Sequence, residues 1–459
     1  MKRIVCILLF LIPIISHAQL NFDKSSKLDY MWMNVGNAGF TTGAANFTNL
    51  VFSPSGVPFI AFSDAGDSGK ATVMKFDGTN WVNVGPADFS AGGATWISLA
   101  FNPSGQPYVA YSDIKDSGKA TVMKFNGTNW VNVGTAGFSV GGAVYLSLAF
   151  NPSGEPYVAF DDYINAFKAT VMKFDGTNWT IVGQAGFSAG LIYYTCLAFN
   201  PSGEPYVAFD DCGNSCNTTV MKFDGTNWVN VGNAGFSAGA TFYTSLAFNP
   251  SGQPYVAYSD YGSAWKTTVM KFDGINWVNV GTAGLSEGMT QYESLAFNPY
   301  NGQPYVAFQD AAHSNKATVM KFDGTNWVSE GNAGFSEGNA EYTSLAFSPS
   351  GKPYVAFRDS TKDYKATVMY YNFPTSINSN EESSLSVYPI PATDKLMIEI
   401  RRQSSEVNLE LTNTEGQELI NQKMEEIRTQ IDISNLPDGL YFLKISDIQM
   451  VQVRKIIKD

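Results

Sequence analysis

The chain has 459 residues, a formal charge of −12 at neutral pH and only 15% charged residues. An acidic, charge-poor chain is a poor partner for nucleic acid, because contact with phosphates requires clustered lysine and arginine. A hydrophobic content of 44% and an aromatic content of 14% indicate a folded chain with a sizeable core, and the length allows one to three domains.

The start of the chain has the pattern of an export signal. Lys2 and Arg3 precede an apolar run over residues 4–15, and a small residue, Ala18, follows it. The run is too short to span a membrane as a helix, and no other stretch of the sequence is a candidate span. We expect residues 1–18 to be removed on export through Sec, which takes the charge from −12 to −14, and we expect no transmembrane segment in the mature chain.

A repeated unit fills most of the remaining chain. The tryptophan of the phrase NWVNVG recurs five times at a spacing of 49 residues and then once at 50, at Trp32, Trp81, Trp130, Trp179, Trp228, Trp277 and Trp327. A fixed period of roughly 40 to 50 residues with short strands is typical of propellers and solenoids. Between Tyr194 and Val231 the strand-like runs are YTCLAF, PYVAF, TTVMKF and WVNV, with turns such as NPSG and DGTN between them. Each unit therefore predicts a four-stranded antiparallel blade.

The two ends of the repeat array favour a closed ring over a solenoid. The array begins with a lone fourth strand, residues 32–35, and ends after a third strand, residues 366–373, that no tryptophan strand follows. One strand from the start and three from the end complete a blade and remove the open edges, whereas a solenoid needs polar capping repeats. We predict an all-β fold in which residues 27–373 form a seven-bladed β-propeller closed by its N-terminal strand.

Comparison of the units places the candidate binding residues on one face of the ring. The NPSG and DGTN turns, nearly the same in every unit, lie on one face, while the loops between second and third strands vary and lie on the other. The loop candidates for ligand contact are Trp265, Tyr261, Tyr163, Phe167 and Tyr364. A set of aromatics begins the innermost strands: Phe47, Trp96, Tyr145, Tyr194, Tyr243, Tyr292 and Tyr342. Within this set Trp96 and Tyr194 are further candidates, and the alternative is that the whole set packs between blades.

An aspartate ends each second strand, at Asp64, Asp113, Asp162, Asp211, Asp260, Asp310 and Asp359. A carboxylate at this place is expected to cap the following loop by accepting backbone N–H bonds. Calcium binding by these side chains is the alternative, although no D-x-D-x-D-G loop supports it. We predict no metal site and no cofactor.

The three cysteines after the export signal belong to one unit. Cys212 and Cys216 share a loop, and export favours oxidation, so the sequence predicts a disulfide between them and leaves Cys196 unpaired. The alternative is three free thiols. A C-x3-C pair without a nearby histidine is weak evidence for zinc.

Missing residue types argue against the common catalytic sites. His313 is the only histidine after the export signal, and Arg358 is the only arginine of the predicted propeller. A Ser-His-Asp triad, a histidine-ligated metal or an arginine cluster that binds a substrate carboxylate is therefore not expected. A pair of carboxylates acting on a glycosidic bond stays as an alternative, with Asp161, Asp162, Asp210, Asp211, Glu287, Glu293, Glu337 and Glu341 as the available acids.

The end of the chain has a different composition. Residues 374–384 are polar and free of aromatics, which predicts a linker. From residue 385 to residue 459, charged runs with period-two alternation are separated by turns, which predicts a small Ig-like β-sandwich.

The tail also contains motifs that resemble those of a known family. VYPIPATD begins at Val387, TEGQ at Thr414, ISNLPDGLYF at Ile433 and the basic RKIIK at Arg454. In this combination the tail resembles the type A C-terminal sorting domain of the type IX secretion system of Gram-negative bacteria, which usually has asparagine at the position of Ile390. The resemblance implies Sec export, recognition by the type IX machinery at the outer membrane and removal of the tail. The alternative is an ordinary sandwich with a ligand of its own.

These observations lead to one expected function and two alternatives. The repeats resemble those of kelch-type and other secreted surface propellers, but they lack the double glycine of kelch, so kelch function does not carry over. We expect a protein that is secreted or attached to the outer-membrane surface and that binds a glycan or a surface protein without catalysis, as in adhesion. The alternatives are a carboxylate-dependent glycan hydrolase or lyase and a structural surface-layer component.

Overall fold

The computed structural model describes residues 31–372, 385–400, 407–413, 417–424, 426–446 and 451–459. The predicted export signal and linker lie outside these residues, as do residues 27–30 and 373 of the predicted propeller. The chain divides into two compact units, with the boundary between Phe373 and Pro374. In the described part of the chain, no helix is long and apolar enough to cross a membrane.

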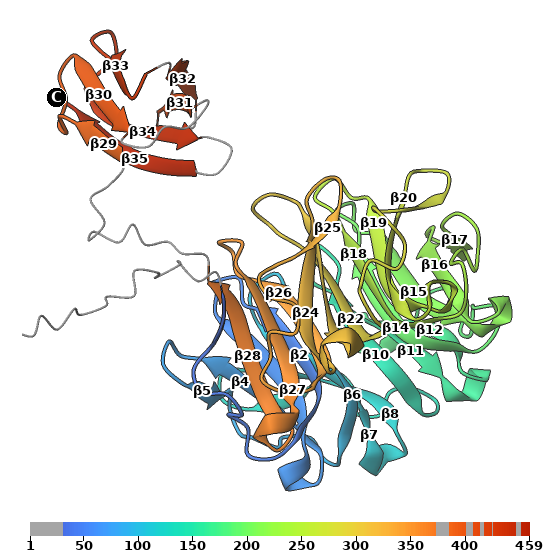
Figure 1. The fold of residues 1–459 in the computed structure, drawn as a ribbon. Helices are drawn as coiled ribbons and strands as arrows, with labels where there is room; N and C mark the ends of the chain where they lie inside the picture. Colours follow the sequence, from blue (N-terminus) through green and yellow to red (C-terminus); the bar gives the residue numbers. More distant parts are fainter. Residues whose placement is uncertain (1–30, 373–384, 401–406, 414–416, 425, 447–450) are drawn as a thin grey trace, which may run out of the picture. The chain divides into compact units, whose positions relative to one another are not determined.

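The first unit is a seven-bladed β-propeller, which confirms the predicted fold (Figure 1). Its innermost strands are β2 (Ala45–Phe52), β6 (Ala94–Phe101), β10 (Ala143–Phe150), β14 (Ile192–Phe199), β18 (Thr241–Phe248), β22 (Thr290–Phe297) and β26 (Ala340–Phe347). The second strands are β3 (Pro58–Asp64), β7 (Pro107–Asp113), β11 (Pro156–Asp162), β15 (Pro205–Asp211), β19 (Pro254–Asp260), β23 (Pro304–Asp310) and β27 (Pro353–Asp359). The third strands are β4 (Lys70–Phe76), β8 (Lys119–Phe125), β12 (Lys168–Phe174), β16 (Asn217–Phe223), β20 (Lys266–Phe272), β24 (Lys316–Phe322) and β28 (Lys365–Asn372). The outer strands are β5 (Trp81–Asn83), β9 (Trp130–Asn132), β13 (Trp179–Ile181), β17 (Trp228–Asn230), β21 (Trp277–Asn279), β25 (Trp327–Ser329) and β1 (Met31–Asn34).

The last blade is assembled from both ends of the unit. Its strand order is β1-β28-β27-β26, so the first strand of the described chain completes the sheet built by the last three. β1 pairs antiparallel with β28 and places Trp32 opposite Tyr371. The ring is therefore closed by backbone hydrogen bonds between segments far apart in the sequence, as the ends of the repeat array predicted.

The inner rim is held by a hydrogen bond repeated at each of the seven junctions between blades. The backbone N–H of Leu197 donates to Ser147 Oγ of the preceding blade at 2.9 Å. The same bond recurs at the other junctions, and the acceptor is Asn49 Oδ1 at one and Cys196 Sγ at another. The serine of the SLAF phrase therefore holds neighbouring innermost strands together.

The outer rim is held by the repeated tryptophans. Trp179 Nε1 donates to the Val133 carbonyl of the preceding blade at 2.7 Å, and its ring stacks on Phe138 of the connecting link at a centroid distance of 4.2 Å. Trp327 keeps the hydrogen bond, to the Val280 carbonyl, but Leu285 replaces the link phenylalanine there. Trp327 is accordingly half-buried, whereas the other six repeat tryptophans are buried.

The hydrophobic core lies between the blades. Val158 and Phe160 of β11, for example, pack in one cluster with Tyr108 and Ala110 of β7. The alternating faces of each second strand are both covered in this way, which is why these strands are buried along most of their length. No blade has a core of its own, so each one is stabilised by its neighbours.

The second unit is a β-sandwich, as predicted. One sheet has the order β29-β30-β33 and the other β32-β31-β34-β35. Their strands are β29 (Leu385–Tyr388), β30 (Lys395–Ile400), β31 (Val407–Thr412), β32 (Glu418–Met424), β33 (Arg428–Asp432), β34 (Gly439–Ser446) and β35 (Val451–Lys458). Leu396 and Ile398 of one sheet and Leu409 and Leu443 of the other are fully buried in one core.

The outer-rim contacts lead to a stability prediction. Trp179→Ala removes a buried ring and its hydrogen bond, so we expect the free energy of unfolding to fall by about 3–5 kcal/mol. Urea unfolding measured by circular dichroism checks this. As a control, Tyr300→Ala removes a side chain that is 86% exposed and should change stability by no more than about 0.5 kcal/mol. A loss at Trp179 no larger than the control would contradict the assigned role.

Candidate functional site

Each innermost strand contains a β-bulge that turns one aromatic side chain toward the ring axis. In the pairing of β10 with β11 the register shifts between Val144 and Ser147, so that Tyr145 and Leu146 lie opposite Phe160 alone. Tyr145 takes a left-handed φ of 52°, and the equivalent aromatic has a φ between 52° and 60° in all seven blades. Bulges re-aim side chains and interrupt regular pairing, and here they build the candidate site.

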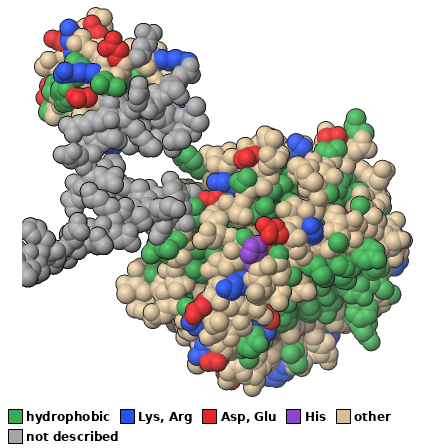
Figure 2. Space-filling model, in the orientation of Figure 1, with side chains coloured by type: hydrophobic (Ala, Val, Ile, Leu, Met, Phe, Trp, Pro, Cys, Tyr) green, Lys and Arg blue, Asp and Glu red, His purple; other side chains and the backbone are tan. Residues whose placement is uncertain are grey.

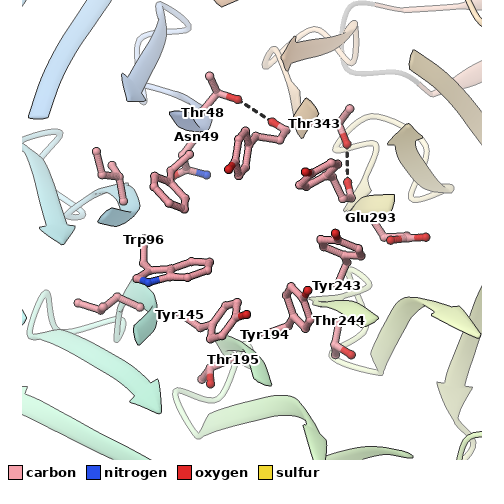
Figure 3. Close-up of a pocket in the computed structure, with 15 residues that line it drawn as sticks. Thr48, Asn49, Trp96, Tyr145, Tyr194, Thr195, Tyr243, Thr244, Glu293 and Thr343 are labelled. Carbon is pink, nitrogen blue, oxygen red and sulfur yellow. Dashed lines mark hydrogen bonds between the residues drawn. The ribbon is translucent and has the colours of Figure 1, made fainter. Parts of the chain in front are cut away.

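The seven bulge aromatics form a closed collar around the axis of the propeller (Figure 3). Consecutive rings have centroid distances from 4.0 to 5.1 Å and interplanar angles from 40° to 54°. The members of this aromatic collar are Phe47, Trp96, Tyr145, Tyr194, Tyr243, Tyr292 and Tyr342. They line a cavity of about 350 Å³, hereafter the axial cavity. Its volume falls within the range of roughly 300–1,000 Å³ that is usual for small-molecule sites.

The sequence left open whether the collar residues contact a ligand or pack between blades, and the structure places them where both are feasible. Trp96 and Tyr194 pack against the collar residues of both neighbouring blades, and both also line the axial cavity. Burial raises the pKa of Tyr145 to about 12, so its phenol stays neutral and can act as a hydrogen-bond donor or acceptor. The collar therefore offers apolar faces and hydroxyl groups in one place, and ligand contact by its members stays a prediction.

Three buried carboxyl groups lie behind the collar, at three consecutive junctions between blades. The Thr195 hydroxyl donates to Asp161, and the Thr244 hydroxyl donates to Asp210. Glu293 accepts from Thr290 at 2.5 Å. Among the described residues, the second carboxyl oxygen of each of these acids has no hydrogen-bond partner.

Burial makes these three acids resist ionisation. Desolvation raises the pKa of Glu293 to about 8, against an ordinary value of 4.5. Desolvation also holds the pKa values of Asp161 and Asp210 well above their usual range, and the charge of a neighbouring acid, Asp210 beside Asp161 and Glu293 beside Asp210, adds to the effect. Glu293 is therefore protonated at neutral pH, ionisation of Asp161 and Asp210 is disfavoured, and each of the three acids is bonded to threonine and not to another acid.

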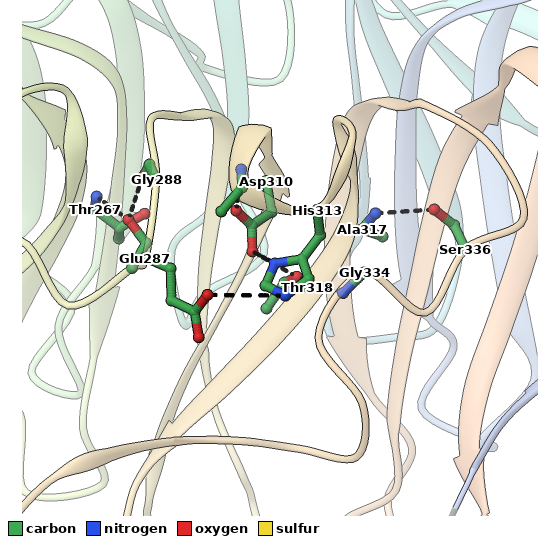
Figure 4. A network of polar contacts seen from close by, with 11 residues as sticks. Thr267, Glu287, Gly288, Asp310, His313, Ala317, Thr318, Gly334 and Ser336 are labelled. Carbon is green, nitrogen blue, oxygen red and sulfur yellow. Dashed lines mark hydrogen bonds and ion pairs between the residues drawn. The ribbon is translucent and has the colours of Figure 1, made fainter.

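The other acids considered from the sequence have partners elsewhere. Glu337 pairs with Lys362 at 2.6 Å, and Glu341 pairs with Arg358 at 2.9 Å. His313 lies between two acids (Figure 4): its Nδ1 is 2.8 Å from Asp310 Oδ2, and its Nε2 is 3.9 Å from Glu287 Oε2. This histidine therefore belongs to a loop network on one blade.

The predicted ring of aspartates caps short helices. The 3-10 helices follow the second strands directly: η1 (Ala65–Asp67), η2 (Ile114–Asp116), η3 (Tyr163–Asn165), η4 (Cys212–Asn214), η5 (Tyr261–Ser263), η6 (Ala311–His313) and η7 (Ser360–Lys362). In every blade the aspartate accepts the backbone N–H two residues on, as Asp162 does from Ile164. Asp162 Oδ2 also accepts from the Thr170 hydroxyl. These carboxylates are engaged within their loops, and the described part of the chain contains no group of three or more His, Cys, Asp or Glu placed to hold a metal.

The loop aromatics fall into separate groups. Tyr261 contacts Trp265, and Trp265 stacks on Phe242 at 5.0 Å. Phe242 in turn contacts Tyr194 of the collar at 6.0 Å, so this group is continuous with the axial cavity. The blades are numbered one to seven by their innermost strands, from β2 to β26. Tyr163 and Phe167 form an edge-to-face pair on blade three, and Tyr364 lies 4.4 Å from the Arg358 guanidinium on blade seven.

Two exposed aromatics were not among the candidates from the sequence. Phe242 and Tyr193 each precede a collar residue and are 39% exposed. The equivalent position differs in every unit: Asn46, Thr95, Val144, Tyr193, Phe242, Gln291 and Glu341. The variation of this position, next to an aromatic that is almost constant, was the signal in the sequence that could have identified these two residues. A position that only packs would be expected to repeat like its neighbours.

The cysteines are divided between a loop and the inner rim. Cys212 and Cys216 are joined by a disulfide bond. Cys196 is free, and its Sγ takes the place of the rim serine by accepting the Leu246 N–H at 3.3 Å. Burial raises the pKa of the Cys196 thiol, so this residue acts as a packing and hydrogen-bonding group.

The comparison with known protein families gave a match to the tail. Residues 386–459 match the family of secretion system C-terminal sorting domains. The tail is a type IX sorting domain. This finding confirms the resemblance stated from the motifs and indicates that the chain is secreted by the type IX route. The search of curated proteins gave no match.

The propeller is similar to several solved structures at low identity. An ulvan lyase, a polysaccharide lyase, has 13% identity and a TM-score of 0.49, with 74% of this chain and 94% of that chain covered. SapL1 lectin in complex with alpha methyl fucoside has 14% identity and a TM-score of 0.43, covering 66% and 99%. An alpha-L-arabinanase of Penicillium chrysogenum has 13% identity and a TM-score of 0.40, covering 63% and 96%. Likenesses of this degree carry no argument about the function of this chain.

The buried acids lead to a prediction about pH. The folded state binds the Glu293 proton up to about pH 8, while the unfolded chain releases it near its ordinary pKa. The stabilisation gained from binding this proton is therefore complete below about pH 4.5. It is lost as the pH rises to about 8, and over this range the free energy of unfolding falls by on the order of 1.4 kcal/mol per pH unit. Glu293→Gln keeps an acceptor for Thr290 and cannot ionise, so we expect a flatter pH profile in urea unfolding between pH 5 and 8. Glu337→Gln, an exposed acid, is the control. An unchanged slope in Glu293→Gln would contradict the buried neutral state.

Proposed function

We propose that this propeller is a non-catalytic binding domain that recognises a glycan or a surface protein outside the cell through its axial cavity. The observation that carries the proposal is the aromatic collar, which surrounds one cavity with seven rings. Concave, mostly apolar sites with a few polar groups are the usual form of small-ligand sites. The sorting tail supports a place of action outside the cell.

A glycan is the preferred ligand because the collar is amphipathic. Five of its seven members are tyrosines, Tyr145, Tyr194, Tyr243, Tyr292 and Tyr342. Each offers an apolar face and a hydroxyl group, and a pyranose likewise has apolar C–H faces and hydroxyl groups at its edge. Thr48, Thr195, Thr244 and Thr343 line the same cavity. All four hydroxyls already donate, Thr195 and Thr244 to buried acids and Thr48 and Thr343 to the carbonyls of Tyr342 and Tyr292, so they are available to a ligand as acceptors.

The arrangement of the acids supports binding without turnover. Hydrolysis of a glycosidic bond by two carboxyl groups needs a protonated acid and an ionised partner on either side of the bond. Burial raises the pKa values of Asp161, Asp210 and Glu293, and threonines engage each of these acids at its own junction. Glu337 and Glu341 are ion-paired with Lys362 and Arg358. Among the described residues that line the cavity, Glu293 is the only acid, and its pKa of about 8 keeps it protonated at neutral pH.

One observation favours a glycan hydrolase or lyase as a second candidate. Glu293 lines the axial cavity, and its pKa of about 8 keeps it protonated at neutral pH. A carboxyl group with a raised pKa is suited to general acid catalysis. Its carboxyl is, however, buried between blades and bonded to Thr290 and Thr267, which favours a structural role.

The proposal predicts that collar substitutions weaken binding. Tyr194→Ala opens the collar, so we expect affinity for a bound glycan to fall by at least about tenfold, which corresponds to about 1.4 kcal/mol. A glycan array followed by calorimetry on the purified chain measures the affinity, and a reducing-end assay in the same samples measures turnover. Tyr194→Phe tests the hydroxyl alone, and Tyr300→Ala, an exposed aromatic in an NPSG-type turn, is the matched control.

The outcomes separate the candidate functions. Binding that Tyr194→Ala loses and Tyr300→Ala keeps, without released reducing ends, supports the glycan-binding proposal. Release of reducing ends that Glu293→Gln abolishes would replace it with the enzymatic candidate. If neither glycan binding nor released reducing ends are detected, the result would favour recognition of a protein partner or a structural surface role.

A further inference from the structure

The face of the propeller that carries the variable loops is divided by charge. One sector, formed by six consecutive segments, contains no Asp, Glu, Lys or Arg: residues 134–142, 163–167, 183–191, 212–216, 232–240 and 261–265. Six of the eight equivalent segments elsewhere contain charged residues, namely Asp67, Asp88, Lys115, Asp116, Glu287, Glu337, Lys362 and Asp363, while the isolated segments 36–44 and 311–315 do not. Because these segments occupy the same places in a ring of similar blades, the uncharged sector is continuous from the link before blade three to the loop of blade five.

Exposed aromatic side chains gather in this sector. Tyr163 is 60% exposed and Tyr261 62% exposed, although each contacts one aromatic neighbour of its own loop, Phe167 and Trp265 respectively. Figure 2 shows a broad hydrophobic surface on this side of the propeller. The aromatic platform is defined here as Tyr163, Phe167, Tyr193, Phe242, Tyr261 and Trp265. Exposed apolar side chains gathered on one sector of a surface in this way mark an interaction site.

Two members of the platform occupy a backbone position that favours glycine. Phe167 and Trp265 have φ values of 58° and 60°, in the left-handed region. Blades one and two have Gly69 and Gly118 at the same position, with φ values of 71° and 72°. The left-handed conformation is unfavourable for a residue with a Cβ atom. Stability alone would therefore favour glycine at this position, as found in blades one and two. Strain of this kind points to a function for the side chain.

The platform is connected to the axial cavity by ring contacts. Trp265 stacks on Phe242, which also contacts Tyr243 of the collar at 6.4 Å. On the neighbouring blade Tyr193 contacts Tyr145 of the collar at 6.1 Å. Aromatic faces therefore extend from the cavity outward over blades four and five without a charged group between them.

We propose that the aromatic platform binds an uncharged polysaccharide chain, several sugars long, whose end occupies the axial cavity. The inference rests on the proposed glycan-binding function and specifies its ligand class. Aromatic faces provide stacking surfaces for successive sugar rings. Asn165, Asn214 and Ser263 donate to the capping aspartates of the same loops and keep oxygen atoms that can accept hydrogen bonds. An acidic polysaccharide would need cations, but the sector offers none in its loops, and Lys168 and Lys266 at its border are half-buried.

The experiment compares ligands of different length on variants at one backbone position. The probes are neutral gluco- and manno-oligosaccharides from monosaccharide to hexasaccharide, with alginate and polygalacturonate as charged counterparts. Trp265→Gly and Phe167→Gly remove platform rings while relieving a left-handed φ. Tyr364→Gly makes the same backbone change at φ 61° on blade seven, beside Arg358 and outside the platform, and is the matched control.

We expect the wild-type chain to bind the neutral hexasaccharide of its preferred sugar more tightly than the monosaccharide. Trp265→Gly should reduce hexasaccharide affinity by at least about tenfold and leave monosaccharide affinity unchanged. Tyr364→Gly should leave both unchanged. The thermal midpoints of the three variants should stay within a few degrees of wild type, because relief of backbone strain offsets the lost ring contacts.

Several results would overturn the inference. If affinity does not increase with ligand length, or if alginate competes as well as the neutral chain, the platform does not bind an uncharged polysaccharide, while the cavity proposal survives through monosaccharide binding. Concentration-dependent association in ultracentrifugation that Trp265→Gly abolishes, with hexasaccharide binding intact, would make the platform an interface between copies. A wild-type chain that binds neither short nor long probes would overturn the inference together with the proposal that the cavity binds a glycan.

Discussion

The structure depends on one constraint: each blade must bond to the next at two radii in the same way at all seven junctions. At the inner rim a leucine N–H donates to the serine-type residue of the preceding blade, as Leu197 does to Ser147. At the outer rim Trp179 bonds the Val133 carbonyl. Two contacts at different radii fix the angle between blades, and β1 closes the ring only because this angle repeats without drift. The core clusters, each shared by two blades, are a consequence of the same geometry.

This constraint separates the parts of a blade that can vary from those that cannot. Rim serines, outer tryptophans and loop-capping aspartates are bonded in nearly every blade, and substitutions there have visible consequences. Where Leu285 replaces the link phenylalanine, Trp327 loses its stacked partner and becomes half-buried. Positions such as Phe242 and Trp265 make no rim bond, so they are free to differ between blades. The residues that differ from blade to blade therefore lie mainly on the loop face and beside the collar.

The sequence was informative about the fold because the fold is periodic. Spacing of 49 residues, four short runs per unit and an array that starts on a fourth strand predicted the blades and their closure, and the motifs around Tyr388 and Gly439 identified the sorting tail. The site was less predictable. That Tyr145 and Tyr194 would touch depends on bulges with left-handed backbone, which alternation within one strand does not reveal. Glu293 likewise lies against Thr267, a residue of the preceding blade.

The raised pKa values of the buried acids and the uncharged sector are two aspects of one electrostatic environment. Ionised Asp161, Asp210 and Glu293 would place repelling charges close behind a collar of aromatic faces, and desolvation disfavours this ionisation. In an acidic chain with a formal charge of −12, a cavity and an adjoining surface that stay uncharged stand apart from the rest of the molecule. A charged ligand would lose its hydration there without gaining a counter-charge, whereas an uncharged ligand with apolar faces would lose little on binding and gain contact with the rings.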